Sequence, residues 1–419
     1  MTTPTSFQSP YGAGKKIEGY IKGNGQKRPL LFKRSFTNID TTWHDTVNYD
    51  TEADTRNLMG QFVDPQVDTY RVQLPNFGTK ELSFAYSKEM VGSPDYYEIN
   101  QRMLGEQPGM VTLDRARLAA AVAQNMQKQF TLAYERFENL YELSRAEILV
   151  KGTFTTTLAG QDGSHKKVAW DMGRTQYAFS TASTQTARDA NKAAIFNERV
   201  PEVNLTTLKA NTSTDVSGGM SWDSKDANNS NAAVTPAVAV SPVKHVNRML
   251  DIAFDRAGTE YIVMSDDAWS WYLYDLNTTY EKMMDTQFSR KVTGLQLDLY
   301  PKPEEIEGLT LQGFHLYGAT QIPVYTYNGR YMDRITGDKT KYVPDGYVVC
   351  VPPSNYGCHR FGKIMHIGAM WAAQQFWINA WKGEKNKIES FEIHTNFVTY
   401  HEDINSVVSW KVCSTAKAS

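Results

Sequence analysis

The feature that most constrains the fold is the run of residues 112 to 151, which contains neither glycine nor proline. Its apolar residues recur at helical spacing, which predicts one long amphipathic helix of about 37 residues, or roughly 55 Å. Thr112 is expected to cap the start, and Gly152 to end the helix. The periodic apolar positions are Leu118, Val122, Met126, Phe130, Ala133, Phe137, Leu140 and Ile148.

A helix of this length usually indicates a coiled coil, a membrane span or a helical repeat. The charges along it and the absence of strict heptads argue against all three, so we expect a scaffold helix laid across an extended domain. The mean hydropathy is −0.49, and no membrane-spanning helix is expected. The first 14 residues lack the apolar stretch of a secretory signal, so export by that route is not expected.

A two-fold alternation of apolar and polar residues over 68 to 86 predicts a β-hairpin. The turn is expected at 75 to 78, where a proline and a glycine supply the required backbone angles. A two-stranded ribbon is marginal in water by itself, so this one is expected to rest on another surface. Its expected contact residues are Tyr70, Arg71, Val72, Leu74, Phe77, Leu82, Phe84 and Tyr86.

The first 38 residues are basic and rich in glycine, with Glu18 as the single acid. This composition indicates a flexible arm, which either is a solvated tail or lies on a neighbouring molecule, and the sequence leaves both readings open. The residues expected to make the contacts of such an arm are Lys15, Lys16, Lys27, Arg28, Lys33 and Arg34.

The second half of the chain mixes helices and strands after a polar stretch. Residues 174 to 243 are dominated by Thr, Ser, Asn, Ala and Asp and indicate an exposed insertion or a linker. Helices are then expected over 246 to 256 and 268 to 275. Strands are expected over 261 to 264, 308 to 317, 322 to 327, 347 to 351, 388 to 400 and 407 to 412. The fold class is therefore α+β.

The ionisable residues show no catalytic or metal-binding motif, and no cofactor is expected. The nearest approach to a metal site is Cys350 and Cys358 with His359 and His366, but the spacing of the cysteines is wider than that of a structural zinc site. Three cysteines, an odd number, favour free thiols in a reducing compartment. The aromatic cluster at 269 to 274 favours a core or interface role over base stacking.

The order of these segments resembles the lambda-type major capsid protein E family of tailed bacteriophages, over roughly residues 43 to 412. Two departures are the extra basic arm and a longer polar stretch between 174 and 217, which could serve partner or decoration proteins. The segments that carry the resemblance are FVDPQV at 62–67, ILVKGTFT at 148–155, VAWDMGR at 168–174, GGMSW at 218–222, the surroundings of Trp269, VPDG at 343–346 and YGC at 356–358.

This resemblance implies a Hong Kong 97-like capsid fold with an N-terminal arm, an extended E-loop hairpin, a peripheral P-domain built on the long helix, and an axial A-domain. The implied division is the arm over 1–57, the E-loop over 58–108, the P-domain helix over 109–173, the polar insertion over 174–243, the A-domain over 244–360, and the return strands of the P-domain with the C-terminus over 361–419.

The function implied is that of a major capsid protein that assembles into pentamers and hexamers of an icosahedral shell, without enzymatic activity. Its expected partners are other copies of itself, scaffolding, portal and decoration proteins, and packaged double-stranded DNA held non-specifically, with no membrane. Its expected location is the virion, and the host cytoplasm during assembly. The net charge of −2 fits a wall that does not grip DNA tightly. The alternatives are a tail-tube or decoration protein, and an enzyme whose site is assembled from distant residues.

Overall fold

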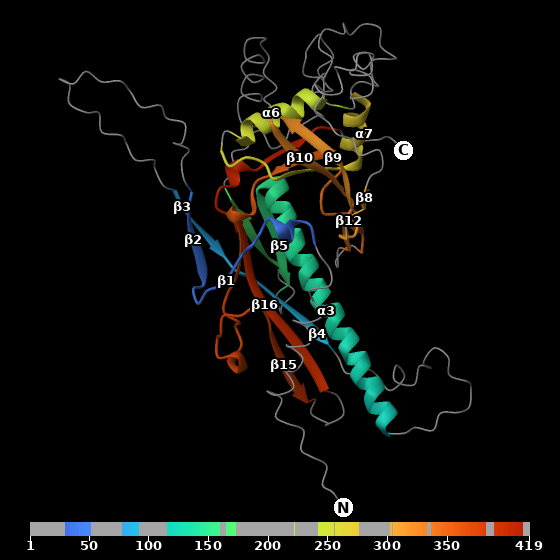
Figure 1. The fold of residues 1–419 in the computed structure, drawn as a ribbon. Coiled ribbons are helices and arrows are strands. Elements are labelled where there is room, and N and C mark those ends of the chain that lie inside the picture. Colours follow the sequence, from blue (N-terminus) through green and yellow to red (C-terminus); the bar gives the residue numbers. More distant parts are fainter. Residues whose placement is uncertain are drawn as a thin grey trace, which may run out of the picture.

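One long helix and two β-sheets organise the protein (Figure 1). The computed structural model describes residues 30–51, 78–91, 115–159, 165–172, 222, 242–254, 256–275, 302–303, 305–332, 337–382 and 389–413. Within these ranges, no helix carries an apolar stretch sufficient to cross a membrane.

The long helix, α3, spans Arg115–Lys151 and contains 37 residues, as its lack of helix breakers predicted. A stripe of side chains that includes Phe130, Phe137 and Tyr141 is buried along one face. Gly152 ends the helix with φ of 74°, and its N–H donates to the carbonyl oxygen of Ile148 at 2.8 Å. The left-handed conformation explains why glycine stands there.

The first sheet lies against α3 and is organised by one long strand, β16 (Glu389–His401). Along one edge of β16, β14 (Gly357–Phe361) pairs with its C-terminal part and β15 (Trp377–Lys382) with its N-terminal part, and β4 (Ala85–Val91) pairs along the other edge. The edge strand β1 (Asn38–Thr41) pairs in parallel with β14.

The second sheet has the order β17-β13-β7-β10-β9-β8. Two helices, α6 (Pro242–Phe254) and α7 (Asp266–Asp275), pack on it. The strands are β7 (Tyr261–Met264), β8 (Lys302–Pro303), β9 (Leu309–Tyr317), β10 (Thr320–Tyr327), β13 (Tyr347–Val351) and β17 (Val408–Lys411). The strands and helices expected in this half of the chain are confirmed, with shifts at some ends.

β7 contributes side chains to both core clusters, because successive side chains of a strand point to opposite faces of the sheet. Tyr261 and Val263 belong to the core cluster around α3, whereas Ile262 and Met264 belong to the cluster beneath α6 and α7. Tyr272 is fully buried in that second cluster, and Trp269 and Trp271 pack against it, so the aromatic cluster has the core role that was favoured.

Two strands lie near the bounds of the expected division. β14, at the expected end of the A-domain, pairs within the sheet that covers α3. β17, in the expected segment of return strands and C-terminus, pairs with β13 in the second sheet. The division into domains stays a prediction.

Short elements complete the fold. Three two-stranded pairs are β2 (Thr46–Thr51) with β3 (Gly78–Ser83), β5 (Thr153–Ala159) with β6 (His165–Asp171), and β11 (Arg330–Met332) with β12 (Lys339–Lys341). Four single turns of 3₁₀-helix are η2 (Phe32–Arg34), η7 (Ser354–Tyr356), η8 (Ile367–Ala369) and η9 (Ile404–Ser406).

The predicted hairpin over 68 to 86 is wrong in its pairing. Gly78, expected in the turn, lies in β3 opposite Thr51, and Leu82 lies opposite Val47. The residues after Phe84 form β4, which pairs with β16 instead. Of the two predicted strands, the one over 82–86 falls at the junction of β3 and β4, and the one over 70–74 lies outside the described residues. A two-fold pattern carries no information about which strand is the partner.

Of the polar insertion expected over 174 to 243, the structure describes Trp222 and the start of α6, and the remainder lies outside the described residues. Trp222 is fully buried in the second core cluster, and its N–H donates to the carbonyl oxygen of Val412 at 2.8 Å. At this point the stretch is part of the folded core. The helix begins at Pro242, four residues before the expected start at 246.

Candidate functional site

The N-terminal segment is anchored where it crosses α3. Leu31, Phe32 and Phe36 are each at most 1% exposed. The ring of Phe32 meets Tyr327 edge to face, with centroids 5.8 Å apart. The expectation of a flexible arm is therefore wrong for residues 30–38, which are folded against the core because their large side chains are buried. Residues 1–29 of the expected arm lie outside the described residues.

Two buried charges on α3 lie under this anchor. The Glu142 carboxylate accepts a hydrogen bond from the backbone N–H of Phe32 at 2.8 Å through Oε1. Its Oε2 lies 3.7 Å from Nη1 of Arg145, too far for a hydrogen bond, and neither atom has another hydrogen-bond partner. Burial raises the pKa of Glu142 to about 7, although Arg145 and the Phe32 N–H both act to lower it.

Lys33 is the described arm residue with a defined partner on α3. Its ammonium lies 3.4 Å from Oε2 of Glu138, whose Oε1 accepts a hydrogen bond from the Tyr134 hydroxyl at 2.8 Å. The expected contact of Lys33 with another subunit stays a prediction, as does that of Arg34, which lies beside it in η2. The other expected arm contacts, Lys15, Lys16, Lys27 and Arg28, lie outside the described residues.

The β2–β3 pair rests on its own chain. Tyr49 stacks on Tyr400 with ring centroids 5.1 Å apart, and its hydroxyl points at the sulfur of Met172, 3.6 Å away. The Trp170 indole N–H donates to the carbonyl oxygen of Ser83 at 2.7 Å. The β2–β3 pair is therefore packed against its own chain, and Figure 1 shows it projecting to one side of the first sheet.

The described part of the predicted contact set packs within the same molecule. Leu82 is 4% exposed, and Phe84 packs against the core cluster around α3. The Tyr86 hydroxyl is hydrogen-bonded to Nδ1 of His394. Tyr70, Arg71, Val72, Leu74 and Phe77 lie outside the described residues, and a role for the set as contacts to another copy stays a prediction.

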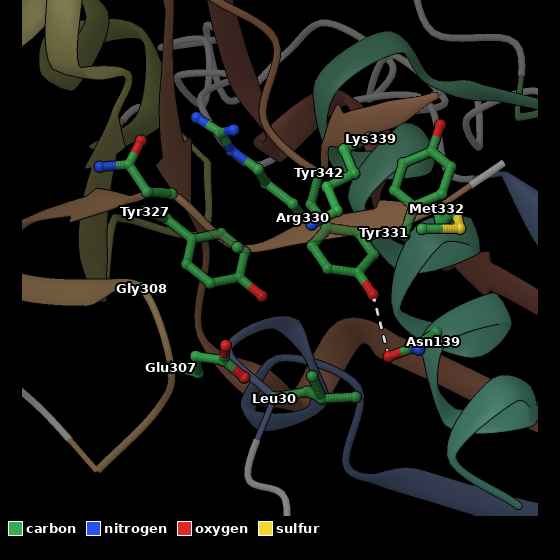
Figure 2. Close-up of a pocket in the computed structure, with 12 residues that line it drawn as sticks. Leu30, Asn139, Glu307, Gly308, Tyr327, Arg330, Tyr331, Met332, Lys339 and Tyr342 are labelled. Carbon is green, nitrogen blue, oxygen red and sulfur yellow. Dashed lines mark hydrogen bonds between the residues drawn. The ribbon is translucent and has the colours of Figure 1, made fainter. Parts of the chain in front are cut away.

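A cavity of about 410 Å³ opens beside the anchor, between α3 and the β11–β12 pair (Figure 2). Tyr327 and Tyr342 stack in its wall, with ring centroids 6.0 Å apart, and the Tyr342 hydroxyl donates to Oδ1 of Asn139 at 3.2 Å. Glu307 is the one carboxylate among the described residues that line it, and they include no histidine or cysteine. Those side chains do not form an acid–base pair.

The four residues considered for a zinc site lie in different elements of the fold. Cys350 lies in β13, where burial raises its thiol pKa far above the ordinary value, and Cys358 lies in β14. Nδ1 of His359 is hydrogen-bonded to the Thr399 hydroxyl at 2.8 Å, and Nδ1 of His366 accepts the Gly368 N–H. Across the described ranges, no three His, Cys, Asp or Glu side chains converge on a point that could hold a metal ion.

Comparisons with known proteins identify the fold. No protein-family model and no curated protein sequence matches the chain. The crystal structure of a protein assigned as a prophage capsid protein, from E. coli CFT073, is 15% identical, covers 96% of this chain and 99% of its own, and has a TM-score of 0.55.

Two further solved structures have lower scores. A phage-related protein from Bordetella bronchiseptica RB50 is 11% identical, with 95% and 96% of the two chains covered and a TM-score of 0.40. The capsid of Cyanophage P-SCSP1u is 7% identical, with 99% and 93% covered and a TM-score of 0.39. The likeness to the E. coli prophage protein shows the fold, and confirms the expected α+β capsid fold of the Hong Kong 97-like type.

Proposed function

We propose that this chain is the major capsid subunit of a tailed double-stranded DNA bacteriophage and that many copies of it form the closed shell. The observation that supports this most strongly is the fold shared with the prophage protein over nearly the whole length of both chains. A match that covers 96% of this chain and 99% of the other is not limited to one common motif.

The architecture suits a plate that tiles a shell. α3 and β16 run side by side along the molecule, and the second sheet with α6 and α7 lies at one end (Figure 1). A subunit of this form offers different surfaces at its two ends. Contacts between unlike surfaces close into rings when the rotation is right, and rings of five and six close an icosahedral shell.

On this proposal the chain has no catalytic role, and its partners are other copies, a scaffolding protein, a portal protein, decoration proteins and packaged DNA. The formal net charge of −2 favours a weak, non-specific contact with DNA. A strongly basic wall would neutralise many phosphates and hold the DNA in place during packing and ejection.

The test is to express the full chain, alone and with the scaffolding protein of its phage, and to examine the product by sedimentation and electron microscopy. Closed particles of uniform diameter are expected. Open tubes would favour a tail-tube subunit, and discrete small oligomers under all assembly conditions would contradict the shell.

A loop exchange tests the proposed inter-subunit role of residues 52–77. Thr51 and Gly78 lie opposite each other at the end of the β2–β3 pair, so an Asn-Gly turn can replace this stretch without changing the register. The matched control makes the same replacement for residues 160–164, between the paired Ala159 and His165 of β5 and β6. The first variant is expected to fold but not to assemble, whereas the control assembles. Equal assembly of both would contradict the role of the 52–77 stretch.

A further inference from the structure

The loop between β14 and β15 presents an apolar surface to solvent. Met365 is 54% exposed, Ile367 84%, Met370 78% and Trp371 50%. Ile367 has the highest exposed fraction of the large apolar side chains in the described ranges. We call these four residues the apolar tip. In Figure 1 the loop projects to the side of β16, between the parts of that strand that pair with β14 and with β15.

The apolar tip is held in place by its own loop. Lys363 and Ala373 form a β-bridge, and the Ile364 N–H donates to the carbonyl oxygen of Ala372 at 3.0 Å. Ile364 is fully buried beneath the loop. Nδ1 of His366 accepts the Gly368 N–H at 3.0 Å, which fixes the start of η8. The exposure of the tip is therefore a consequence of a defined structure.

The backbone at the apolar tip is also strained. Met370 and Trp371 have φ values of 49° and 59°, in the left-handed region that side-chain-bearing residues rarely adopt. Two consecutive residues of this kind persist only where the surrounding structure enforces them, and such sites often serve a function. Here the strained residues are the ones whose side chains point their apolar surface at solvent.

A fifth exposed apolar side chain belongs to a segment that is joined by an ion pair to the start of the tip loop. Trp43 is 65% exposed and lies two residues from Asp45, whose carboxylate is 2.7 Å from the ammonium of Lys363. A buried aromatic side chain covers about 150–250 Å², so Trp371 and Trp43, each at least half exposed, together present roughly 200 Å², to which Met365, Ile367 and Met370 add. A contiguous apolar patch of a few hundred Å² is about the largest that a monomer exposes, and such a patch often binds a partner.

We propose that the apolar tip docks on a second copy of this chain. This inference rests on the proposed shell function, in which other copies are the most abundant neighbours. A stable contact buries about 800 Å² on each partner, with an apolar centre and a polar rim. The tip supplies the apolar centre, and the Lys363–Asp45 pair supplies part of the rim. An anionic lipid surface is a poorer match, because Lys363 is already neutralised by Asp45.

The first experiment compares a double variant, Ile367→Asp with Met370→Asp, with a control, Met332→Asp. Met332 is 63% exposed on β11, so the control adds a charge at a similar exposed methionine elsewhere. The concentration needed for assembly, measured by sedimentation velocity, is expected to rise at least tenfold in the double variant and to stay unchanged in the control. Thermal unfolding by circular dichroism should show both variants folded. Assembly of the folded double variant at the wild-type concentration would overturn the proposal.

A second measurement separates this inference from the shell itself. A photo-crosslinking amino acid at position 367 of the full chain is irradiated at assembly concentrations, and the products are mapped by mass spectrometry. Crosslinks to another copy support the docking, even if the copies form small oligomers and the shell proposal fails. Closed particles without any crosslink between copies from position 367 would overturn the docking and leave the shell standing, and monomers without such crosslinks would overturn both.

Discussion

Replacing Glu142 by glutamine tests whether burial or the pairing with Arg145 decides the pKa of the Glu142 carboxyl group. The two influences on the carboxyl group oppose each other. Burial penalises the charged form, whereas Arg145 and the Phe32 N–H favour it. Arg145, 3.7 Å away and without a hydrogen bond to the carboxylate, offsets the burial only in part. Burial therefore prevails, and the pKa of Glu142 rises from 4.5 to about 7.

The sign of the pH effect follows from this raised pKa. The folded state holds the proton of Glu142 more tightly than the unfolded state, so its contribution to stability is complete below pH 4.5 and is lost as the pH rises through about 7. At about 1.4 kcal/mol per pKa unit, the loss amounts to about 3 kcal/mol. Glutamine keeps an oxygen for the Phe32 N–H and carries no charge at any pH, so the Glu142→Gln variant does not lose this free energy.

The assay is urea unfolding of the subunit under conditions where it does not assemble, at pH 4.5, 5.5, 6.5 and 7.5. The free energy of unfolding of the variant, minus that of the wild type, is expected to increase by about 3 kcal/mol across the series. Glu147→Gln is the control for the change of charge itself, because Glu147 lies on the same helix in a partly exposed pair with Lys151. A Glu142→Gln difference that is flat, or that falls with pH, would show that Arg145 governs the site and would refute the reasoning.

Three further predictions concern single contacts. Trp170→Phe removes the indole N–H that donates to the Ser83 carbonyl oxygen, and it should lower the free energy of unfolding by about 1 kcal/mol. Amide hydrogen exchange in β3 should also become faster, and unchanged exchange would contradict the prediction. Gly346→Ala should lower the melting temperature more than Gly318→Ala, because both glycines have positive φ but only at Gly346 would the new Cβ lie 2.6 Å from a backbone oxygen; equal losses would refute the clash. Burial lowers the pKa of His315 to about 4, so its contribution to stability should be complete above pH 6.5 and fall by about 3 kcal/mol as the pH drops towards 4. His315→Gln should flatten this decline in urea unfolding, and an equally steep decline in the variant would count against it.

The main elements could be predicted from the sequence because their signals are local. The absence of glycine and proline over 112 to 151 and the helical spacing of its apolar residues predicted α3, and Gly152 marked its end. The apolar runs at 261–264 and 347–351 became β7 and β13 with the expected bounds, since a short buried strand needs only a continuous apolar run.

Features that depend on distant residues could not be predicted in this way. The pairing of β3 with β2 joins segments separated by residues 52–77, and the alternation at 82 to 86 is equally compatible with a nearer partner. Glu142 and Arg145 look like surface charges on an amphipathic helix, and only the packing of Phe32 above them shows that they are buried. The apolar tip could not be predicted either, because the sequence does not distinguish its exposed apolar residues from core residues.

The central claim is that copies of this chain close into a shell, and the mass and shape of the assembled full-length protein test it most directly. Mass photometry and cryo-electron microscopy of the protein, expressed with the scaffolding protein of its phage, should show closed particles of multi-megadalton mass built of pentamers and hexamers. A folded protein that stays monomeric, or forms only small oligomers, under all assembly conditions would contradict the claim.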